Sequence, residues 1–152
     1  MARILIIDDN ADHRAIFGRF IEHAGHQAIG VATALDGLTY TRQQLPDMVV
    51  LDLRLPDLDG WTVASRLRSH PRTQQIPVLI MTAEPLAREL IAAPAAEYDA
   101  ILLKPFDMGT FLAVIERLLA PQPSDLGTTP ARMTLQRIVG TSCQPPSDLT
   151  GN

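Results

Sequence analysis

The sequence predicts a doubly wound α/β fold, in which helices cover both faces of a five-stranded parallel sheet. Short apolar runs bounded by polar residues recur along the first 120 residues, and helical patterns lie between them. Runs of this kind are typical of buried parallel strands. The clearest runs are Ile4–Ile7, Met48–Leu51, Val78–Met81 and Ile101–Leu103. Successive strand–helix units, joined by right-handed crossovers, give the doubly wound sheet.

The predicted strands and helices alternate along the chain. Strands are expected at residues 3–7, 27–32, 47–52, 77–82 and 99–103. Helices are expected at residues 11–24, 35–44, 60–69, 85–93 and 107–119. Gly25 ends the first helix, and the second, which begins near Asp36, stops before Pro46. The third ends near Pro71, and the fourth is weak because Pro94 ends or kinks it. The fifth shows the clearest helical spacing, with Met108, Phe111, Leu112, Ile115, Leu118 and Leu119.

This pattern ends at Ala120, and the composition changes beyond it. Half of residues 121–152 are Pro, Gly, Ser or Thr, and none is aromatic. The chain is therefore expected to divide into a domain at 1–120 and a tail at 121–152 that is flexible or serves as a linker. Two alternatives stay open for the apolar piece Ala131–Val139. It is disordered, or it docks on this domain or on a second copy.

Composition and charge exclude several classes of protein. The formal net charge is −4 and no basic stretch stands out, which argues against nucleic-acid binding through phosphate contacts. The single cysteine, Cys143, excludes an internal disulfide and a cysteine-based zinc site. No apolar run approaches the ~18 residues of a membrane span, and no N-terminal signal is visible. We therefore expect a cytoplasmic protein that binds neither nucleic acid nor a membrane.

The candidate functional site consists of polar residues that close, or directly follow, the predicted strands. They are Asp8, Asp9, Asp52, Thr82 and Lys104. Because the carboxyl ends of parallel strands gather along one edge of a sheet, these side chains are expected to meet. Carboxylates about 4 Å apart repel by about 4 kcal/mol at an effective dielectric near 20, so the cluster needs a cation. A hard divalent ion, Mg²⁺ or Mn²⁺, suits these oxygen ligands and commonly bridges carboxylates to a phosphoryl group.

Four segments carry a resemblance to a known family. They are Ile4-Leu-Ile-Ile-Asp8-Asp9-Asn10, Val50-Leu-Asp52-Leu-Arg-Leu-Pro56-Asp-Leu-Asp59-Gly60, Ile80-Met-Thr82-Ala83 and Leu103-Lys104-Pro105-Phe106. In these motifs and in their spacing, residues 1–120 resemble the receiver domain of two-component response regulators. The resemblance implies a flavodoxin-like fold and a phosphorylatable signalling switch.

The resemblance also implies a role for each site residue. Asp52 would accept the phosphoryl group, while Lys104 and Thr82 would contact it, with Thr82 acting as a switch. The ligands of Mg²⁺ would be Asp8, Asp9, Asp52 and the backbone carbonyl of Arg54. The donor would be a phosphohistidine on a sensor histidine kinase or a phosphotransfer protein. The output would be a downstream protein target, and a homodimer is one possible state. Such a domain is not an enzyme in the usual sense, since it catalyses only its own phosphorylation and dephosphorylation.

The chain departs from the family pattern three residues before its lysine. Ile101 stands three residues before Lys104, where the resemblance leads us to expect an aromatic switch residue, and Tyr98 is the nearest substitute. This departure keeps a second interpretation open, a pseudo-receiver that binds its protein partner constitutively without phosphorylation. Arg54 and Glu84 are expected at the rim of the pocket. They are either two exposed charges or a pair that shields the acyl phosphate from water.

Other chemistries have less support. The segment from Asp57 to Thr62 looks like the nucleophile loop of haloacid-dehalogenase-type phosphatases, but no hydrophobic strand directly precedes it. Asp59 is instead predicted to be the N-cap of the third helix. The sequence shows neither a Ser-His-Asp set nor a glycine-rich phosphate loop. The four histidines show no ligand spacing, although His13 stands near the acid pair. Trp61 is expected to pack against a neighbour.

Overall fold

The structure, a computed structural model, describes residues 1–83 and 98–120. The predicted helix at 85–93 and the predicted tail at 121–152 lie outside the described residues. Glu84, Pro94 and Cys143 lie outside them as well. The described part forms a five-stranded parallel sheet with helices on both of its faces.

The element bounds agree with the prediction to within one residue. The strands are β1 (Arg3–Ile7), β2 (Gln27–Val31), β3 (Met48–Asp52), β4 (Val78–Thr82) and β5 (Ala100–Leu103). The helices are α1 (Ala11–His23), α2 (Ala34–Gln44), α3 (Gly60–Ser69) and α5 (Met108–Leu119). Helix α2 begins at Ala34, one residue before the predicted range, because Thr33 is the N-cap and its hydroxyl accepts the N–H of Asp36 at 3.1 Å. The helix ends before Pro46 as predicted, with Leu45 in a left-handed conformation.

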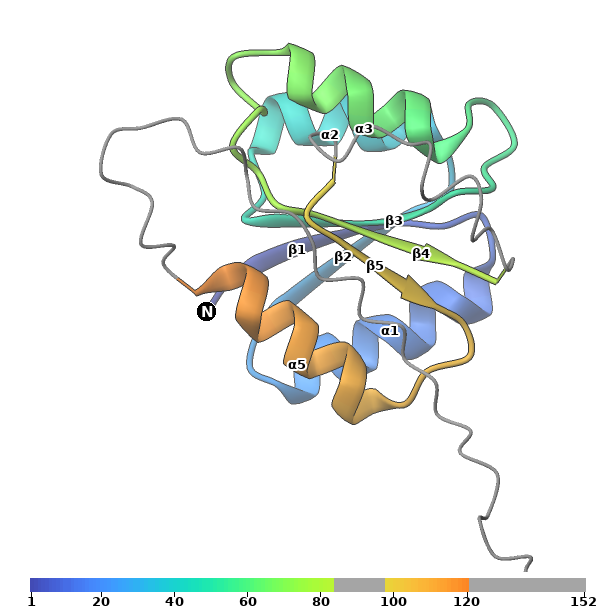
Figure 1. Cartoon of the computed structure of the whole chain (residues 1–152), viewed down its shortest axis with the longest axis vertical. Coiled ribbons are helices and arrows are strands. Elements are labelled where there is room, and N and C mark those ends of the chain that lie inside the picture. Colours follow the sequence, from blue (N-terminus) through green and yellow to red (C-terminus); the bar gives the residue numbers. More distant parts are fainter. Residues whose placement is uncertain (84–97, 121–152) are drawn as a thin grey trace, which may run out of the picture.

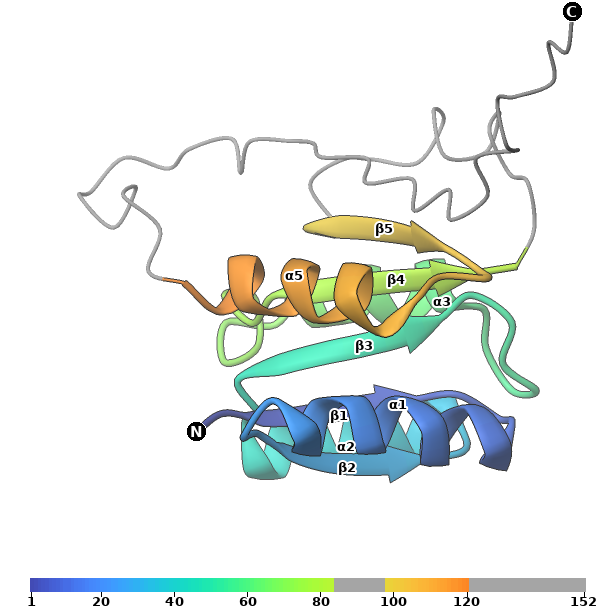
Figure 2. The same cartoon turned by 90° about the horizontal axis from the view of Figure 1, so that it is seen from below.

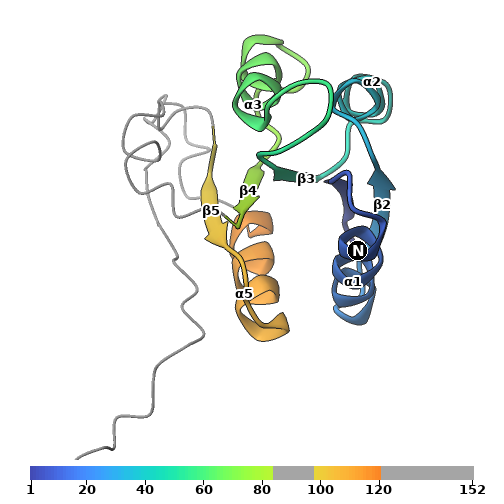
Figure 3. The same ribbon diagram turned by 90° about the vertical axis from the view of Figure 1, so that its right-hand side faces the viewer.

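The strand order is β2-β1-β3-β4-β5, which Figure 2 shows from the lower side of the sheet. Helices α2 and α3 lie on one face, and α1 and α5 lie on the other (Figures 1 and 3). The chain runs outward from β1 to β2 and then returns past β1 to β3, so the winding direction reverses between β1 and β3. This confirms the doubly wound, flavodoxin-like fold. The reversal also marks the point where such sheets bind ligands, beyond the carboxyl ends of the strands.

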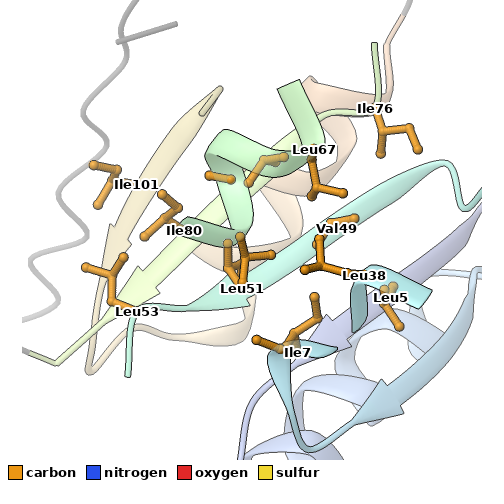
Figure 4. Close-up of a cluster of buried hydrophobic side chains, with 14 residues drawn as sticks. Leu5, Ile7, Leu38, Val49, Leu51, Leu53, Leu67, Ile76, Ile80 and Ile101 are labelled. Atoms are coloured by element: carbon orange, nitrogen blue, oxygen red, sulfur yellow. The ribbon is translucent and has the colours of Figure 1, made fainter. Parts of the chain in front are cut away.

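Two apolar clusters hold the helices to the sheet, because successive strand residues point to opposite faces. Leu5 and Ile7 of β1 face α2 and α3, in the cluster that Figure 4 shows. Ile4 and Ile6 face α1 and α5. In this second cluster the rings of Phe111 and Phe17 pack together, with their centroids 5.3 Å apart. Each fully buried Leu, Ile or Phe contributes about 1.5–3 kcal/mol, so the strand ends that carry the site rest on a well-anchored core.

Candidate functional site

The acidic residues of the site leave adjacent strands at the same level. Ile7 of β1 pairs with Leu51 of β3, so the next residues along the chain are Asp8 and Asp52. They lie on either side of the reversal between β1 and β3. Both residues are buried, with exposed fractions of 0% and 9%. Two buried carboxylates at neighbouring strand ends are largely shielded from water and repel each other, so they require positive charge beside them.

Lys104 supplies that charge from the other side of the site. Its backbone is held by the neighbouring strand. Thr82 of β4 pairs with Leu103 of β5, and the N–H of the next residue, Lys104, donates to the carbonyl of Thr82 at 2.8 Å. The peptide bond between Lys104 and Pro105 is cis. The ammonium of Lys104 donates to Asp52 Oδ2 at 2.9 Å and to Asp8 Oδ2 at 3.4 Å. Its side chain is only 13% exposed, so water screens these contacts weakly.

The remaining oxygen of each carboxylate accepts a backbone N–H two residues further on. Asn10 donates to Asp8 Oδ1 at 2.9 Å, and Arg54 donates to Asp52 Oδ1 at 2.9 Å. The Asn10 side chain in turn accepts the N–H groups of Asp12 and His13, so it is the N-cap of α1. Both acidic side chains are therefore fixed in orientation by the first turn of the chain that follows them.

The loop after β3 is anchored at both of its ends. The N–H of Gly60 donates to the carbonyl of Leu53 at 2.9 Å, and a Cβ at Gly60 would lie 2.7 Å from the carbonyl oxygen of Asp52. Only glycine permits α3 to begin this close to the backbone of β3. Asp59 accepts the N–H of Thr62 at 2.8 Å, which confirms it as the N-cap of α3.

Asp57 ties the same loop to the start of α2. Its two carboxylate oxygens accept the N–H groups of Ala34 and Leu35, each at 2.9 Å. Burial raises the pKa of Asp57, but these two donors and the backbone N–H groups of Asp57 and Leu58 together lower it by more, so the pKa lies below the ordinary value of 3.8. The residue is an anchor between the loop and a helix N-terminus, which is a role for this acid that the sequence pattern did not predict.

The predicted site residues meet to different degrees. Asp8, Asp52 and Lys104 are in direct contact. Thr82 is buried, with 2% exposed, and its backbone holds the position of Lys104. Asp9 and Arg54 are exposed beside their buried neighbours.

The sequence analysis noted that His13 stands near the acid pair but did not include it in the site. Its Nδ1 atom lies 3.3 Å from Asp8 Oδ2 and 3.1 Å from the Nζ of Lys104. One ligand atom each from Asp8, His13 and Asp52 lies within 4.8 Å of the others, which makes these three a possible metal-binding group. Two carboxylates at a strand edge also fit a hard cation with oxygen ligands.

A family model supplies the observation that decides the identity of the chain. The model of the response regulator receiver domain matches residues 4–116. The chain belongs to the response regulator receiver family. Receiver domains are signalling switches of two-component systems, and the recognition made from the sequence motifs is confirmed.

Curated relatives of this receiver differ in length. It is 39% identical over 119 residues to RpaA of Synechocystis sp., described as a DNA-binding dual master transcriptional regulator. That match covers 78% of this chain and 49% of RpaA. The receiver is also 32% identical over 120 residues to the protein PilH of Pseudomonas aeruginosa, and this match covers 79% of this chain and 99% of PilH. The receiver therefore spans about half the length of one relative and nearly all of another.

Solved structures confirm the fold of this receiver. A putative response regulator from Chloroflexus aurantiacus is 29% identical, with a TM-score of 0.74, covering 79% of this chain and 98% of the other. The receiver domain of the sensor histidine kinase PA1611 from Pseudomonas aeruginosa is 24% identical, with a TM-score of 0.70, covering 78% and 97%. That domain carries a magnesium ion in its active-site cleft. Among the described residues of our receiver, no helix is long and apolar enough to cross a membrane.

Ile101, at the position expected to hold an aromatic switch residue, and Tyr98, its nearest substitute, lie in different surroundings. Ile101, in β5, is buried in the cluster under α2 and α3, with 4% exposed. Tyr98, just before β5, packs against Trp61 at the start of α3, with ring centroids 5.8 Å apart. This contact confirms that Trp61 packs against a neighbour.

Proposed function

We propose that this receiver accepts a phosphoryl group on Asp52 in the presence of Mg²⁺, and that the modification changes its protein interactions. The contact that carries the proposal is the one between the Lys104 ammonium and Asp52, at 2.9 Å. It places a fixed positive charge at the carboxylate that would react, inside a largely buried pocket. Phosphoryl transfer depends mostly on this kind of positioning and charge neutralisation.

In the proposed transfer, the protein supplies a nucleophile and holds charged groups in place. A carboxylate oxygen of Asp52 attacks the phosphorus of a phosphohistidine, the P–N bond breaks, and the imidazole leaves with a proton from water. Asp8, Asp9, Asp52 and the carbonyl of Arg54 would hold Mg²⁺, which when bound neutralises charge on the phosphoryl oxygens. Lys104 moves its hydrogen bond from the carboxylate to a phosphoryl oxygen, and the hydroxyl of Thr82 donates to another. The donor is a sensor histidine kinase or a phosphotransfer protein.

The proposed output is a change at the edge of β4 and β5. The backbone of Lys104 is bonded to Thr82, so a phosphoryl group that draws both side chains inward acts on both strands at once. The downstream partner is a protein rather than nucleic acid, since the net charge is −4 and no basic stretch stands out. A second copy of the chain, giving a homodimer, is one candidate partner. The place of action is the cytoplasm.

Intact mass after incubation with acetyl phosphate and Mg²⁺ tests the proposal. We expect wild type to gain the mass of one phosphoryl group and Asp52→Asn to gain none. Asp36→Asn is the matched control, because this acid is exposed in the first turn of α2. Labelling of Asp52→Asn equal to that of wild type would contradict the assignment.

The buried Ile101 favours a second candidate function, a pseudo-receiver with constitutive partner binding. An aliphatic side chain packed in the core gives no aromatic ring that alternates between inward and outward positions. Beryllofluoride with Mg²⁺ separates the two functions, since it mimics the acyl phosphate without a donor. Amide chemical-shift changes in β4 and β5 support the switch, and an unchanged wild-type spectrum supports the binding module.

A further inference from the structure

His13 has a position in the site that the proposed phosphoryl transfer does not use. It lies in the first turn of α1, and its ring packs 5.8 Å from that of Phe17. Its side chain is 37% exposed, yet Nδ1 points inward to Asp8 Oδ2 at 3.3 Å and to the Nζ of Lys104 at 3.1 Å. The imidazole therefore presents one nitrogen to the pocket and the rest of its ring to the outside.

The neighbours of Nδ1 determine which role this nitrogen has. Nδ1 has two neighbours with opposite requirements, since the ammonium of Lys104 can only donate and the carboxylate of Asp8 can only accept. In the tautomer that carries its proton on Nε2, Nδ1 accepts from Lys104 and its lone pair faces the pocket. A lone pair in this orientation is also what a transition-metal ion requires of a histidine ligand.

The three acceptor atoms around Lys104 Nζ are arranged about one point, as the ligands of a single ion are. The Nζ atom lies 2.9 Å from Asp52 Oδ2, 3.1 Å from His13 Nδ1 and 3.4 Å from Asp8 Oδ2. Ligand atoms of these three residues lie within 4.8 Å of one another. Ligand atoms about 2.1 Å from an ion in a tetrahedral site lie about 3.4 Å apart, so any pair near the 4.8 Å limit must close by about 1.4 Å when the ion binds. The pocket already holds a cation, the ammonium, at the point where such an ion would bind.

We propose that Asp8, His13 and Asp52 form an alternative binding site for a divalent ion of the zinc class, occupied in place of the Lys104 ammonium. Imidazole nitrogen together with carboxylate oxygen suits Zn²⁺ and Co²⁺, whereas Mg²⁺ prefers oxygen ligands alone. His13 is thus the residue that determines which metals this receiver binds. Binding in this mode requires Lys104 to move away from Asp52.

This site has a consequence that rests on the proposed function. The zinc-class ion shares Asp8 and Asp52 with Mg²⁺ and covers the oxygen of Asp52 that Lys104 now contacts. It therefore competes with Mg²⁺ and prevents Asp52 from accepting a phosphoryl group. A zinc-class ion is an inhibitor of this receiver, and His13 is the residue that makes it potent.

Calorimetric titration of the full chain with zinc chloride tests the binding site directly. We expect His13→Gln to weaken Zn²⁺ binding by about 10- to 100-fold, the loss that even an outer-shell partner of a metal ligand produces. The affinity for Mg²⁺ should stay within about twofold, because an oxygen-only ion makes no use of the imidazole. His23→Gln is the matched control, since His23 is an exposed histidine at the other end of α1. Cys143→Ser is a second control that removes the only thiol.

Cobalt gives an independent readout of the ligands. The visible absorption of bound Co²⁺ should appear with wild type and both controls, and it should be lost with His13→Gln. Equal Zn²⁺ affinities of wild type and His13→Gln, or Co²⁺ absorption that depends on His23 or Cys143, would overturn the proposal. So would the absence of Zn²⁺ binding to wild type.

Labelling by acetyl phosphate separates this inference from the proposed function. At fixed Mg²⁺, added Zn²⁺ should block labelling of wild type at concentrations about tenfold lower than those that block His13→Gln. If neither protein is labelled without Zn²⁺, the proposed function fails, while the calorimetric comparison still decides the metal site. If both are labelled and Zn²⁺ inhibits them equally, the inhibitory mode is wrong.

Discussion

The ammonium of Lys104 lies 2.9 Å from Asp52 Oδ2, although the two residues are 52 positions apart in the sequence. The contact closes a cluster in which Asp8 is fully buried and Asp52 nearly so. We expect Lys104→Met to lower the free energy of unfolding by about 1–3 kcal/mol, because it leaves two buried acids without their shared cation. Millimolar Mg²⁺ should recover part of this loss, since it binds the folded state.

Urea denaturation at neutral pH, with and without Mg²⁺, measures the effect of Lys104→Met. Arg117→Met is the control, since Arg117 is an exposed basic residue near the end of α5. A Lys104→Met protein as stable as the Arg117 variant would show that the acids do not depend on the ammonium.

The close packing around Gly60 leaves no room for a larger residue at this position, next to the site. A Cβ there would lie 2.7 Å from two backbone atoms, the carbonyl oxygen of Asp52 and the Cα of Leu53. Backbone atoms do not yield as the end of a flexible side chain would, so Gly60→Ala should destabilise the protein by about 1–3 kcal/mol. It should also slow acetyl phosphate labelling by displacing Asp52.

The matched control for this substitution is Gly109→Ala in α5. The nearest atom to a Cβ at Gly109 is Asp107 Oδ1 at 3.5 Å, an ordinary contact, and alanine favours a helix. In thermal and urea unfolding, Gly60→Ala should therefore lower the free energy of unfolding, whereas Gly109→Ala should raise it or lower it by clearly less. Equal effects would mean that the close approach at Gly60 is relieved without cost.

Asp57 predicts a pH dependence of stability. Its pKa lies below 3.8 in the folded state, so its carboxylate contributes stability that is fully present above 3.8. This contribution is lost as the pH falls from 3.8 through the lower pKa of the folded protein. We expect Asp57→Asn to be less stable than wild type at neutral pH, and the difference to shrink at acidic pH. Urea denaturation of both proteins across this range measures it, and a difference that does not change with pH would contradict the anchoring of α2 by charge.

The pair of Trp61 and Tyr98 provides a spectroscopic reporter of switching. Trp61 follows Gly60, which contacts the backbone of Asp52, and Tyr98 precedes β5, the strand that leads to Lys104. Since Trp61 is the only tryptophan in the chain, its emission reports on the surroundings of this one residue, including the contact with Tyr98. Beryllofluoride with Mg²⁺ should change the emission of wild type and leave that of Asp52→Asn unchanged. A constant wild-type emission would favour the pseudo-receiver.

The parts of the site that follow from strand order could be predicted from the sequence. Asp8, Asp52 and Lys104 each end or directly follow an apolar run, and parallel strands bring such positions to one edge whatever the loops do. The element bounds followed for a similar reason, since apolar periodicity and Gly or Pro residues mark them locally. The start of α2 was placed late because the capping threonine, Thr33, was not recognised as the stronger signal.

His13 and Asp57 could not be placed in the same way. His13 reaches the pocket because Asn10 caps α1 and turns its first residues over the end of β1, a geometry that spacing alone does not reveal. Asp57 bonds to residues 22 and 23 positions earlier, so its role depends on the path of a loop. Both contacts are set by side-chain direction, which periodicity in a sequence does not encode.

Reductive trapping of the acyl phosphate tests the central claim most directly. Borohydride converts an aspartyl phosphate into homoserine, and peptide mapping then shows which aspartate carried the phosphoryl group. After treatment with acetyl phosphate and Mg²⁺, the account predicts homoserine at position 52 alone, and none when EDTA replaces Mg²⁺. Homoserine at any other aspartate, or at none, would contradict it.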